Sequence, residues 1–255
     1  ALRAALAEFE ALLTLDMNVA ERLIAAGAPA EKVLVSGAME DSDPALPCND
    51  AERQELAEAV GTRPVWLAAA AQLNDWPDLC IAHQDASRQA HRLLLIVVPA
   101  KSRDAPEFAE KMRGQGFHVT LRSEDETPGE PTQVYVVDTD EELGLWYRIA
   151  PITYLGGTLN GGGCRDPFEA TALGSAVLYG PLVAPYGKHA ARLNTAGASR
   201  LIRSSDDMGN VIETLLSPDK TAEIAHAAWD VTSRGADVTN RVAAYINDRL
   251  EEMGH

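Results

Sequence analysis

A glycine-rich loop between a strand and a short helix is the feature of this chain best suited to chemistry. The segment from Tyr154 to Pro181 predicts, in order, a strand, the glycine-rich loop, a helix and a second strand. Glycines let the backbone turn sharply and approach a ligand closely. Asp166 is placed to cap the helix, and Pro167 suits its first position. Free N–H groups and the dipole at a helix start favour an anion, so the pattern predicts a phosphate or carboxylate site.

The spacing of this loop excludes two common nucleotide sites. No Gly-Lys-Ser/Thr follows the glycines, which excludes the phosphate loop of the Walker type. The loop lies in the middle of the chain and lacks a clean G-x-G-x-x-G, so it is a poor dinucleotide fingerprint. An ordinary connection between a strand and a helix is the alternative to a ligand site.

Polar groups in and beside the loop are the candidate ligand contacts. Backbone or hydroxyl groups of the loop could donate to a phosphate, and Arg165 could add a bidentate, charge-assisted contact or form an ion pair. Lys101 and Arg103 follow a predicted strand and could reach the same anion. The alternative is that both are solvent-exposed loop residues that contact no ligand. The predicted binding set is Gly156, Gly157, Thr158, Gly162, Gly163, Arg165, Asp166, Glu169, Lys101 and Arg103.

Composition limits the partners of the chain. It has 255 residues with a net charge of −16, which argues against nucleic acid and against unaided docking to an anionic membrane. An anionic ligand would need a local basic pocket to overcome this background. The three cysteines show neither zinc spacing nor a disulfide framework, and no residue cluster has metal-ligand spacing. No signal peptide or membrane span is recognisable, so we expect a cytoplasmic protein.

Strand and helix signals alternate along almost the whole chain. This alternation, with nearly continuous apolar strands, predicts an α/β fold with a Rossmann-like parallel sheet and helices on both faces. In such a sheet, ligands bind beyond the carboxyl ends of the strands, where the glycine loop lies. We expect a break in the last helix at Gly235. The predicted strands of the sheet cover residues 64–69, 93–98, 117–121, 133–137, 152–155, 176–179 and 200–202.

The glycine loop resembles the nucleotide-sugar loop of the 3-deoxy-D-manno-octulosonic acid (Kdo) transferases, which use CMP-Kdo. That family has G-G-S-L, a short insert, G-G-H-N-P-L-E-P-A and later G-P. Gly156 to Leu159 match the first part, Pro167 to Ala170 the second, and Gly180-Pro181 the last. Further segments match in order along nearly the whole chain, including Trp66 to His83 and Asp138 to Leu143.

The chain departs from the family at polar positions. The family's H-E-G-E-E corresponds to Gln72 to Trp76, which keeps one acid, and its P-R-H-P-E-R corresponds to Pro99 to Asp104. The H-N of the glycine loop is replaced by Arg165-Asp166. These differences indicate a divergent member, with another donor or weakened activity as alternatives.

The resemblance implies the C-terminal, donor-binding domain of a GT-B glycosyltransferase of lipopolysaccharide biosynthesis. It implies residues 1–40 as a remnant of the acceptor domain, 41–50 as a linker and 51–255 as the donor-binding domain. The donor would be CMP-Kdo, with no metal or other cofactor, and Glu169 would bind the ribose hydroxyls. The family's catalytic base is a glutamate of the N-terminal half, so the catalytic residues of this chain are unknown and we expect it to be inactive alone.

The same resemblance implies a lipid A precursor as acceptor, bound by the missing domain, and work at the cytoplasmic face of the inner membrane. Two alternatives remain open. One is another GT-B enzyme, either a UDP- or GDP-sugar transferase or an epimerase. The other is a non-catalytic module that has lost its site and binds a partner.

Overall fold

The computed structural model describes residues 2–37, 45–124, 127–139 and 142–252. The chain divides into two compact units, one formed by residues 1–44 with 232–255 and the other by residues 45–231. Most of the linker predicted at 41–50 lies outside the described residues, and residues 45–49 precede the first helix of the second unit without regular structure. Residues 232–255 fall in the first unit, whereas the sequence prediction keeps 51–255 together.

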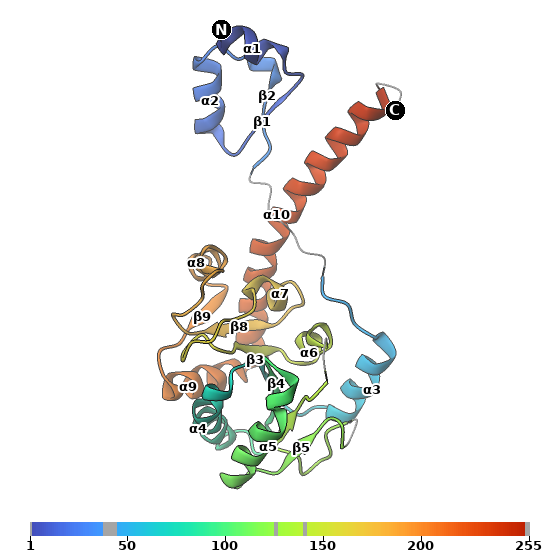
Figure 1. Cartoon of the computed structure of the whole chain (residues 1–255), viewed down its shortest axis with the longest axis vertical. Coiled ribbons are helices and arrows are strands. Elements are labelled where there is room, and N and C mark those ends of the chain that lie inside the picture. Colours follow the sequence, from blue (N-terminus) through green and yellow to red (C-terminus); the bar gives the residue numbers. More distant parts are fainter. Residues whose placement is uncertain (1, 38–44, 125–126, 140–141, 253–255) are drawn as a thin grey trace. The chain divides into compact units, whose positions relative to one another are not determined.

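A seven-stranded, fully parallel sheet organises the second unit (Figure 1). The strands are short and rich in Val, Ile, Leu and Ala, as expected of parallel strands buried on both faces. In spatial order they are β5 (Val119–Leu121), β6 (Val134–Val136), β4 (Leu94–Pro99), β3 (Val65–Ala71), β7 (Ile152–Leu155), β8 (Ala176–Tyr179) and β9 (Ser199–Leu201).

Helices cover both faces of the sheet, which confirms the predicted fold class. Because successive side chains of a strand point to opposite faces, Trp66 and Leu67 of β3 enter two different hydrophobic cores. The core around Trp66 includes residues of α4 (Trp76–Ser87), α5 (Ala105–Gly114) and α9 (Ser205–Leu215). The core around Leu67 includes residues of α3 (Asp50–Val60), α6 (Leu143–Ile149), α7 (Pro167–Thr171) and α8 (Gly187–Thr195).

The first unit contains a small βαβ motif. Two parallel strands, β1 (Leu12–Thr14) and β2 (Val33–Val35), are joined by α2 (Met17–Ala25) and the 3₁₀ turn η1 (Ala30–Lys32), and α1 (Leu2–Glu8) precedes them. The Asp16 carboxylate caps α2 by accepting the Val19 N–H at 2.8 Å. Leu13, Leu34 and Val35 are exposed on these two strands, which is unusual for a parallel sheet.

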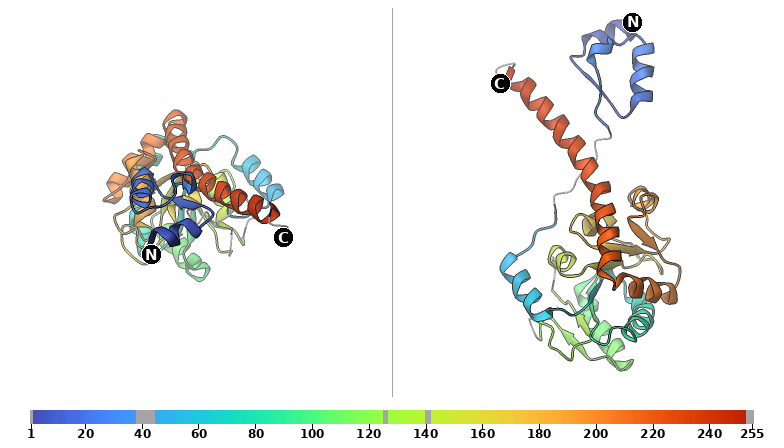
Figure 2. Two further views of the ribbon diagram at one scale, coloured as in Figure 1. Left: turned by 90° about the horizontal axis from the view of Figure 1, so that it is seen from above. Right: turned by 180° about the vertical axis from the view of Figure 1, so that it is seen from behind.

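The last helix, α10 (Pro218–Glu252), is continuous through Gly235, so the predicted break there is wrong (Figure 2). A single glycine in a helix costs only about 1 kcal/mol relative to alanine, which the rest of a long helix readily offsets. None of the helices in the described parts of the chain is long and apolar enough to cross a lipid bilayer.

Candidate functional site

The strand order places the topological switch point of the sheet between β3 and β7, and we call the space beyond the carboxyl ends of these two strands the crevice. From β3 the chain continues to β4 and to the β5–β6 edge, and then returns to β7 on the other side of β3. The connections that leave the carboxyl ends of β3 and β7 therefore run in opposite directions, which is where open α/β sheets bind ligands. The first of these connections begins at Gln72 and the second at Gly156, the start of the glycine loop.

The first two glycines of the loop are required by close packing against the protein. A Cβ atom on Gly156 would lie 2.4 Å from the Cα of Ala71 at the end of β3. A Cβ atom on Gly157 would lie 2.1 Å from the carbonyl oxygen of Gly163, and the Gly157 φ is +72°. The N–H of Gly156 donates to the Ala69 carbonyl at 2.8 Å. The N–H of Gly157 also donates a hydrogen bond within the protein, to the Asp75 carboxylate. These two glycines therefore hold the start of the loop against the end of β3.

The Asp75 carboxylate holds the two crevice loops together, and sequence reasoning did not place it in the site. It lies at the end of the 3₁₀ turn η2 (Leu73–Asp75) and is fully buried. Its Oδ2 accepts the N–H of Gly157 at 2.7 Å and the N–H of Gln72 at 2.9 Å. Its Oδ1 accepts the amide Nδ2 of Asn160 at 3.2 Å. The one acid retained from the H-E-G-E-E segment of the family was the available signal.

Burial raises the pKa of Asp75, while the hydrogen bonds from Gly157, Gln72 and Asn160 act in the opposite direction. The carboxylate form matches its surroundings, because each of these three neighbours offers a donor. Asn160 extends the network, since its Nδ2 also donates to Asp78 of α4 at 2.7 Å. The glycine loop is therefore bound to both the end of β3 and the start of α4.

Thr158, predicted to contact a ligand, is fully buried and has a structural role. Its hydroxyl donates to the Leu155 carbonyl at 2.6 Å and accepts the Gly180 N–H at 2.8 Å. Both hydrogen bonds are made within the protein and link the carboxyl ends of β7 and β8. The prediction of a ligand contact through the Thr158 hydroxyl is therefore corrected.

Gly162 and Gly163 form the exposed part of the loop. Their φ angles are +111° and +92°, in the region that favours glycine. The Gln72 side chain reaches across the crevice, and its Nε2 donates to the Gly163 carbonyl at 3.3 Å. A Cβ atom on Gly163 would meet nothing within 4 Å. The backbone of Gly163 therefore faces open space, whereas a Cβ atom on Gly162 would lie 2.8 Å from Gln72 Cγ.

Arg165 and Glu169 form a bidentate ion pair on one turn of chain. Arg165 Nε lies 2.9 Å from Glu169 Oε2, and Nη2 lies 2.8 Å from Oε1. Burial lowers the pKa of Arg165, but the hydrogen bond and charge of Glu169 outweigh it and raise the pKa overall. The Glu169 side chain is 14% exposed and the Arg165 side chain 42% exposed. Of the two uses expected for Arg165, a ligand contact and an ion pair, the structure shows the ion pair.

Asp166 is the N-cap of α7, as predicted, and Pro167 occupies the first turn. The Oδ1 atom of Asp166 accepts the Phe168 N–H at 2.9 Å. The same carboxylate lies 2.9 and 2.8 Å from Nδ1 of His189, on the first turn of α8. The His189 ring stacks on the Phe168 ring with a centroid distance of 4.1 Å and an interplanar angle of 5°. His189 is absent from the predicted binding set, although its position after Gly180-Pro181 allows it to line the same site.

Lys101 and Arg103 lie beyond the carboxyl end of β4, in and before the 3₁₀ turn η3 (Ser102–Asp104). Both are exposed, and Arg103 lies 3.8 Å from the Asp104 carboxylate. Among the described residues, no hydrogen bond or ion pair joins either one to the glycine loop. β4 is two strand spacings from β7, roughly 10 Å, so only a ligand that extends across β3 would reach both.

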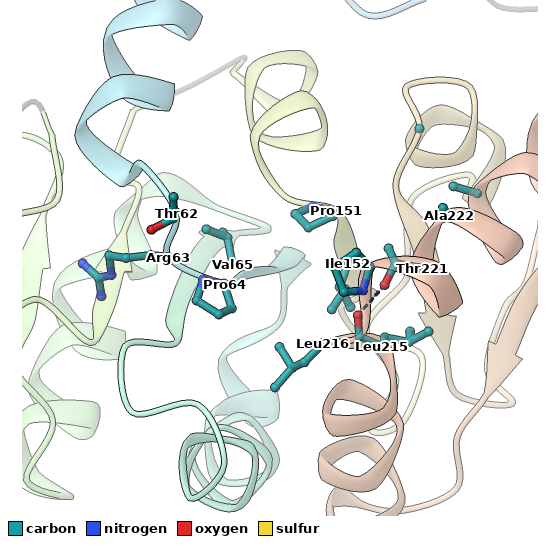
Figure 3. Close-up of a pocket in the computed structure, with 13 residues that line it drawn as sticks. Thr62, Arg63, Pro64, Val65, Pro151, Ile152, Leu215, Leu216, Thr221 and Ala222 are labelled. Atoms are coloured by element: carbon teal, nitrogen blue, oxygen red, sulfur yellow. Dashed lines mark hydrogen bonds between the residues drawn. The ribbon is translucent and has the colours of Figure 1, made fainter.

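A cavity of about 440 Å³ lies at the opposite, amino-terminal edge of the sheet. Its walls are largely apolar and come from the start of β3, the start of β7 and the α9–α10 connection (Figure 3). The glycine loop lies at the carboxyl edge, where ligands of such sheets bind, so this cavity is separate from the glycine-loop site. Within the described ranges, no group of three or more His, Cys, Asp or Glu residues is arranged to hold a metal ion.

Comparisons with known proteins find similarity to Kdo transferases. No established family profile matches the chain. A Kdo transferase from Rickettsia bellii is 25% identical over 179 residues, which are 70% of this chain and 43% of the relative. A Kdo transferase from Bordetella pertussis is 27% identical over 259 residues, covering 98% of this chain and 59% of the relative. The chain thus spans about half the length of the curated relatives it matches.

The fold comparison agrees with the sequence comparison. The crystal structure of the C-terminal CMP-Kdo binding domain of WaaA from Acinetobacter baumannii matches with a TM-score of 0.66 and 22% identity. The match covers 72% of this chain and 98% of that domain. The Rossmann-like fold of a GT-B C-terminal half is therefore confirmed.

Replacing Asp75 with alanine should lower the free energy of unfolding by about 2–4 kcal/mol, because buried N–H donors lose their acceptor. Urea denaturation followed by circular dichroism measures the change. The matched control is Asp85→Ala in α4, because Asp85 is half-buried and its ion pair with the exposed Arg88 should contribute less than about 1 kcal/mol. Equal losses for the two variants would contradict the role assigned to Asp75.

Proposed function

We propose that this chain, which belongs with the C-terminal half of the Kdo transferases, binds the nucleotide-sugar donor of a glycosyltransferase, and that the donor is a CMP-sugar. The observation that carries the proposal is the glycine loop at the β3–β7 crevice, with Gly162 and Gly163 exposed beyond its clamped first part. The position is where the fold binds ligands, and the related Acinetobacter domain is described as binding CMP-Kdo.

Sugar transfer from a nucleotide requires stabilisation of the negative charge on the departing phosphate. Backbone N–H groups of Gly162 and Gly163 and the half-exposed guanidinium of Arg165 are suited to this task. Lys101 and Arg103 would contact the donor only where it extends over β3. This proposal needs no metal ion, because the backbone N–H groups and the Arg165 guanidinium supply the positive potential at the phosphate.

Glu169 is proposed to accept hydrogen bonds from the ribose hydroxyls. Its carboxylate is acceptor-only when ionised, and the bidentate contact with Arg165 fixes its orientation. A carboxylate with four lone-pair directions can serve Arg165 and a hydroxyl at the same time. Glu169 therefore acts as a specificity element for ribose, while the glycine loop faces the phosphate.

The acceptor and the catalytic base are proposed to belong to a further domain, with a lipid A precursor as acceptor at the cytoplasmic face of the inner membrane. The first unit supports a further protein contact. Its parallel strands expose Leu13, Leu34 and Val35, whereas parallel sheets are normally covered on both faces. On this proposal the chain alone binds donor and transfers nothing.

The donor site is tested by calorimetric titration of the chain with CMP, UDP and GDP. We expect CMP to bind most tightly and Gly163→Ala to weaken it at least about tenfold, or about 1.4 kcal/mol, by placing a methyl group at the phosphate. Gly116→Ala is the matched control, because Gly116 has a φ of +90°, close to the +92° of Gly163, and equally open surroundings.

Equal weakening by Gly163→Ala and Gly116→Ala would show that backbone strain, and not the ligand contact, is responsible. A clear preference for UDP or GDP would refute the CMP assignment and leave the fold unchanged. Silence with all three nucleotides, in a sample with a cooperative thermal transition, would overturn the proposal and favour a degenerate module.

The ribose contact is tested by comparing CMP with 2′-deoxy-CMP. The wild-type chain should bind 2′-deoxy-CMP about 5–10-fold more weakly, because the Glu169 carboxylate loses a hydrogen bond of about 1 kcal/mol or more. In Glu169→Ala, CMP should bind as weakly as 2′-deoxy-CMP. A preference for CMP that persists in this variant would refute the role of Glu169.

A further inference from the structure

Asp166 and His189 form a carboxylate–imidazole pair beside the glycine loop. Nδ1 of His189 lies 2.9 Å from Asp166 Oδ1 and 2.8 Å from Oδ2. The carboxylate is fixed from its other side, because Oδ1 also caps α7. The imidazole plane is fixed by the face-to-face stack on Phe168. Both partners are therefore held in one relative orientation.

This geometry determines which nitrogen of neutral His189 carries the proton and which has the lone pair. An ionised carboxylate only accepts hydrogen bonds, so Nδ1 must carry the proton that points at Asp166. Among the described residues, Nε2 has no protein partner, and the side chain is 30% exposed. Neutral His189 thus presents a bare Nε2, whereas protonated His189 presents an Nε2–H donor.

The pair lies where the glycine loop meets the β8–α8 connection. Asp166 is three residues beyond Gly163, and Cys164 Sγ lies 4.0 Å from the Ala184 carbonyl oxygen in that connection. A Cβ atom on Gly161 would lie 3.9 Å from Leu182, also in that connection. These contacts place His189, on the first turn of α8, at the rim of the same loop.

The groups around His189 include one carboxylate, two cations and an aromatic ring. Arg165 and Glu169 neutralise each other, which leaves Asp166 as a negative charge at the loop whenever His189 is neutral. On α8, Lys188 is exposed, and Arg192 lies over the Phe168 ring at 5.2 Å. The Tyr186 ring is 6.5 Å from the His189 ring. Protonation of His189 neutralises Asp166 and adds a donor, in a chain with a net charge of −16.

We propose that the Asp166–His189 pair recognises the phosphate of the bound nucleotide, with the His189 imidazolium donating its Nε2–H to a phosphate oxygen and Asp166 orienting the ring. The inference rests on the proposed function, since it names a phosphate contact of that donor site. Asp166 is then a positioning residue and does not itself contact the phosphate. The pairing of Asp166 with the His189 imidazolium also explains why an acid is tolerated beside an anion site.

The test is calorimetric titration with CMP, and with cytidine as the ligand without phosphate, between about pH 5.5 and 8.5. Because the ligand's own ionisation is common to all variants, the informative quantity is the affinity ratio of variant to wild type at each pH. For CMP, His189→Gln should bind about tenfold more weakly than wild type at pH 5.5 and within about twofold at pH 8.5. For cytidine the ratio should stay near one.

Two further variants sharpen the test. Asp166→Asn retains an oxygen to cap α7 but removes the charge, so at pH 8.5 it should bind CMP several-fold more tightly than wild type. His91→Gln is the matched control, since His91 is exposed just before β4, at the amino-terminal edge of the sheet. It should leave the affinity for CMP unchanged at every pH.

Imidazole ¹⁵N NMR of the wild-type chain provides a readout that is independent of the variants. We expect His189 in the Nδ1–H form when neutral, with a shift of its Nε2 resonance on addition of CMP and none with cytidine. An Nε2–H form, or a His189→Gln ratio that is constant with pH, would overturn the phosphate contact. In both cases CMP binding by the wild type would leave the proposed function standing, whereas no CMP binding at any pH would refute both.

Discussion

The buried carboxylate of Asp75 is the interaction on which the candidate site depends. Parallel strands bring the ends of β3 and β7 together, but strand pairing alone does not determine how the two loops beyond them are shaped. Asp75 gives the loops a shared acceptor, because it accepts N–H groups from Gln72 on one side and Gly157 on the other. A buried charge is tolerated only when donors surround it, and here three donors do so. The glycine loop is therefore preorganised before any ligand arrives.

The fold could be predicted because its determinants are local and repeated. Apolar runs such as Leu94–Pro99 and Ile152–Leu155 identify buried strands, and the glycine, Asp166 and Pro167 signals identify the start of α7. The continuity of α10 at Gly235 was missed, because helix propensity is a weak term that a long helix overrides. The strand order was not predictable from these signals, since it depends on contacts between residues far apart in sequence.

The site was predicted less completely, for the same reason. The glycine loop could be recognised from its spacing, and an ion pair was one of the two uses expected for Arg165, but its partner Glu169 was singled out only through the family resemblance. Thr158 reads as a ligand contact until the packing of β7 against β8 shows that its hydroxyl is used internally. Asp75 stands out in the sequence only as the one acid retained in the Gln72–Trp76 segment, and its contact with Gly157, 82 residues away, depends on the fold. The contact of His189 with Asp166, 23 residues away, depends on the fold in the same way.

The glycine loop has two parts with different freedom to change during evolution. In the first part, a methyl group on Gly156 or Gly157 would overlap backbone atoms of Ala71 or Gly163, so substitution there is opposed by the fold itself. A Cβ atom on Gly161 or Gly163 would meet no atom closer than 3.9 Å, and Arg165-Asp166, just beyond them, replaces the H-N of the family that the chain resembles. The positions at which the chain departs from the family thus lie beyond the part of the loop that the fold constrains. Side chains there can change while the sheet beneath keeps its stability.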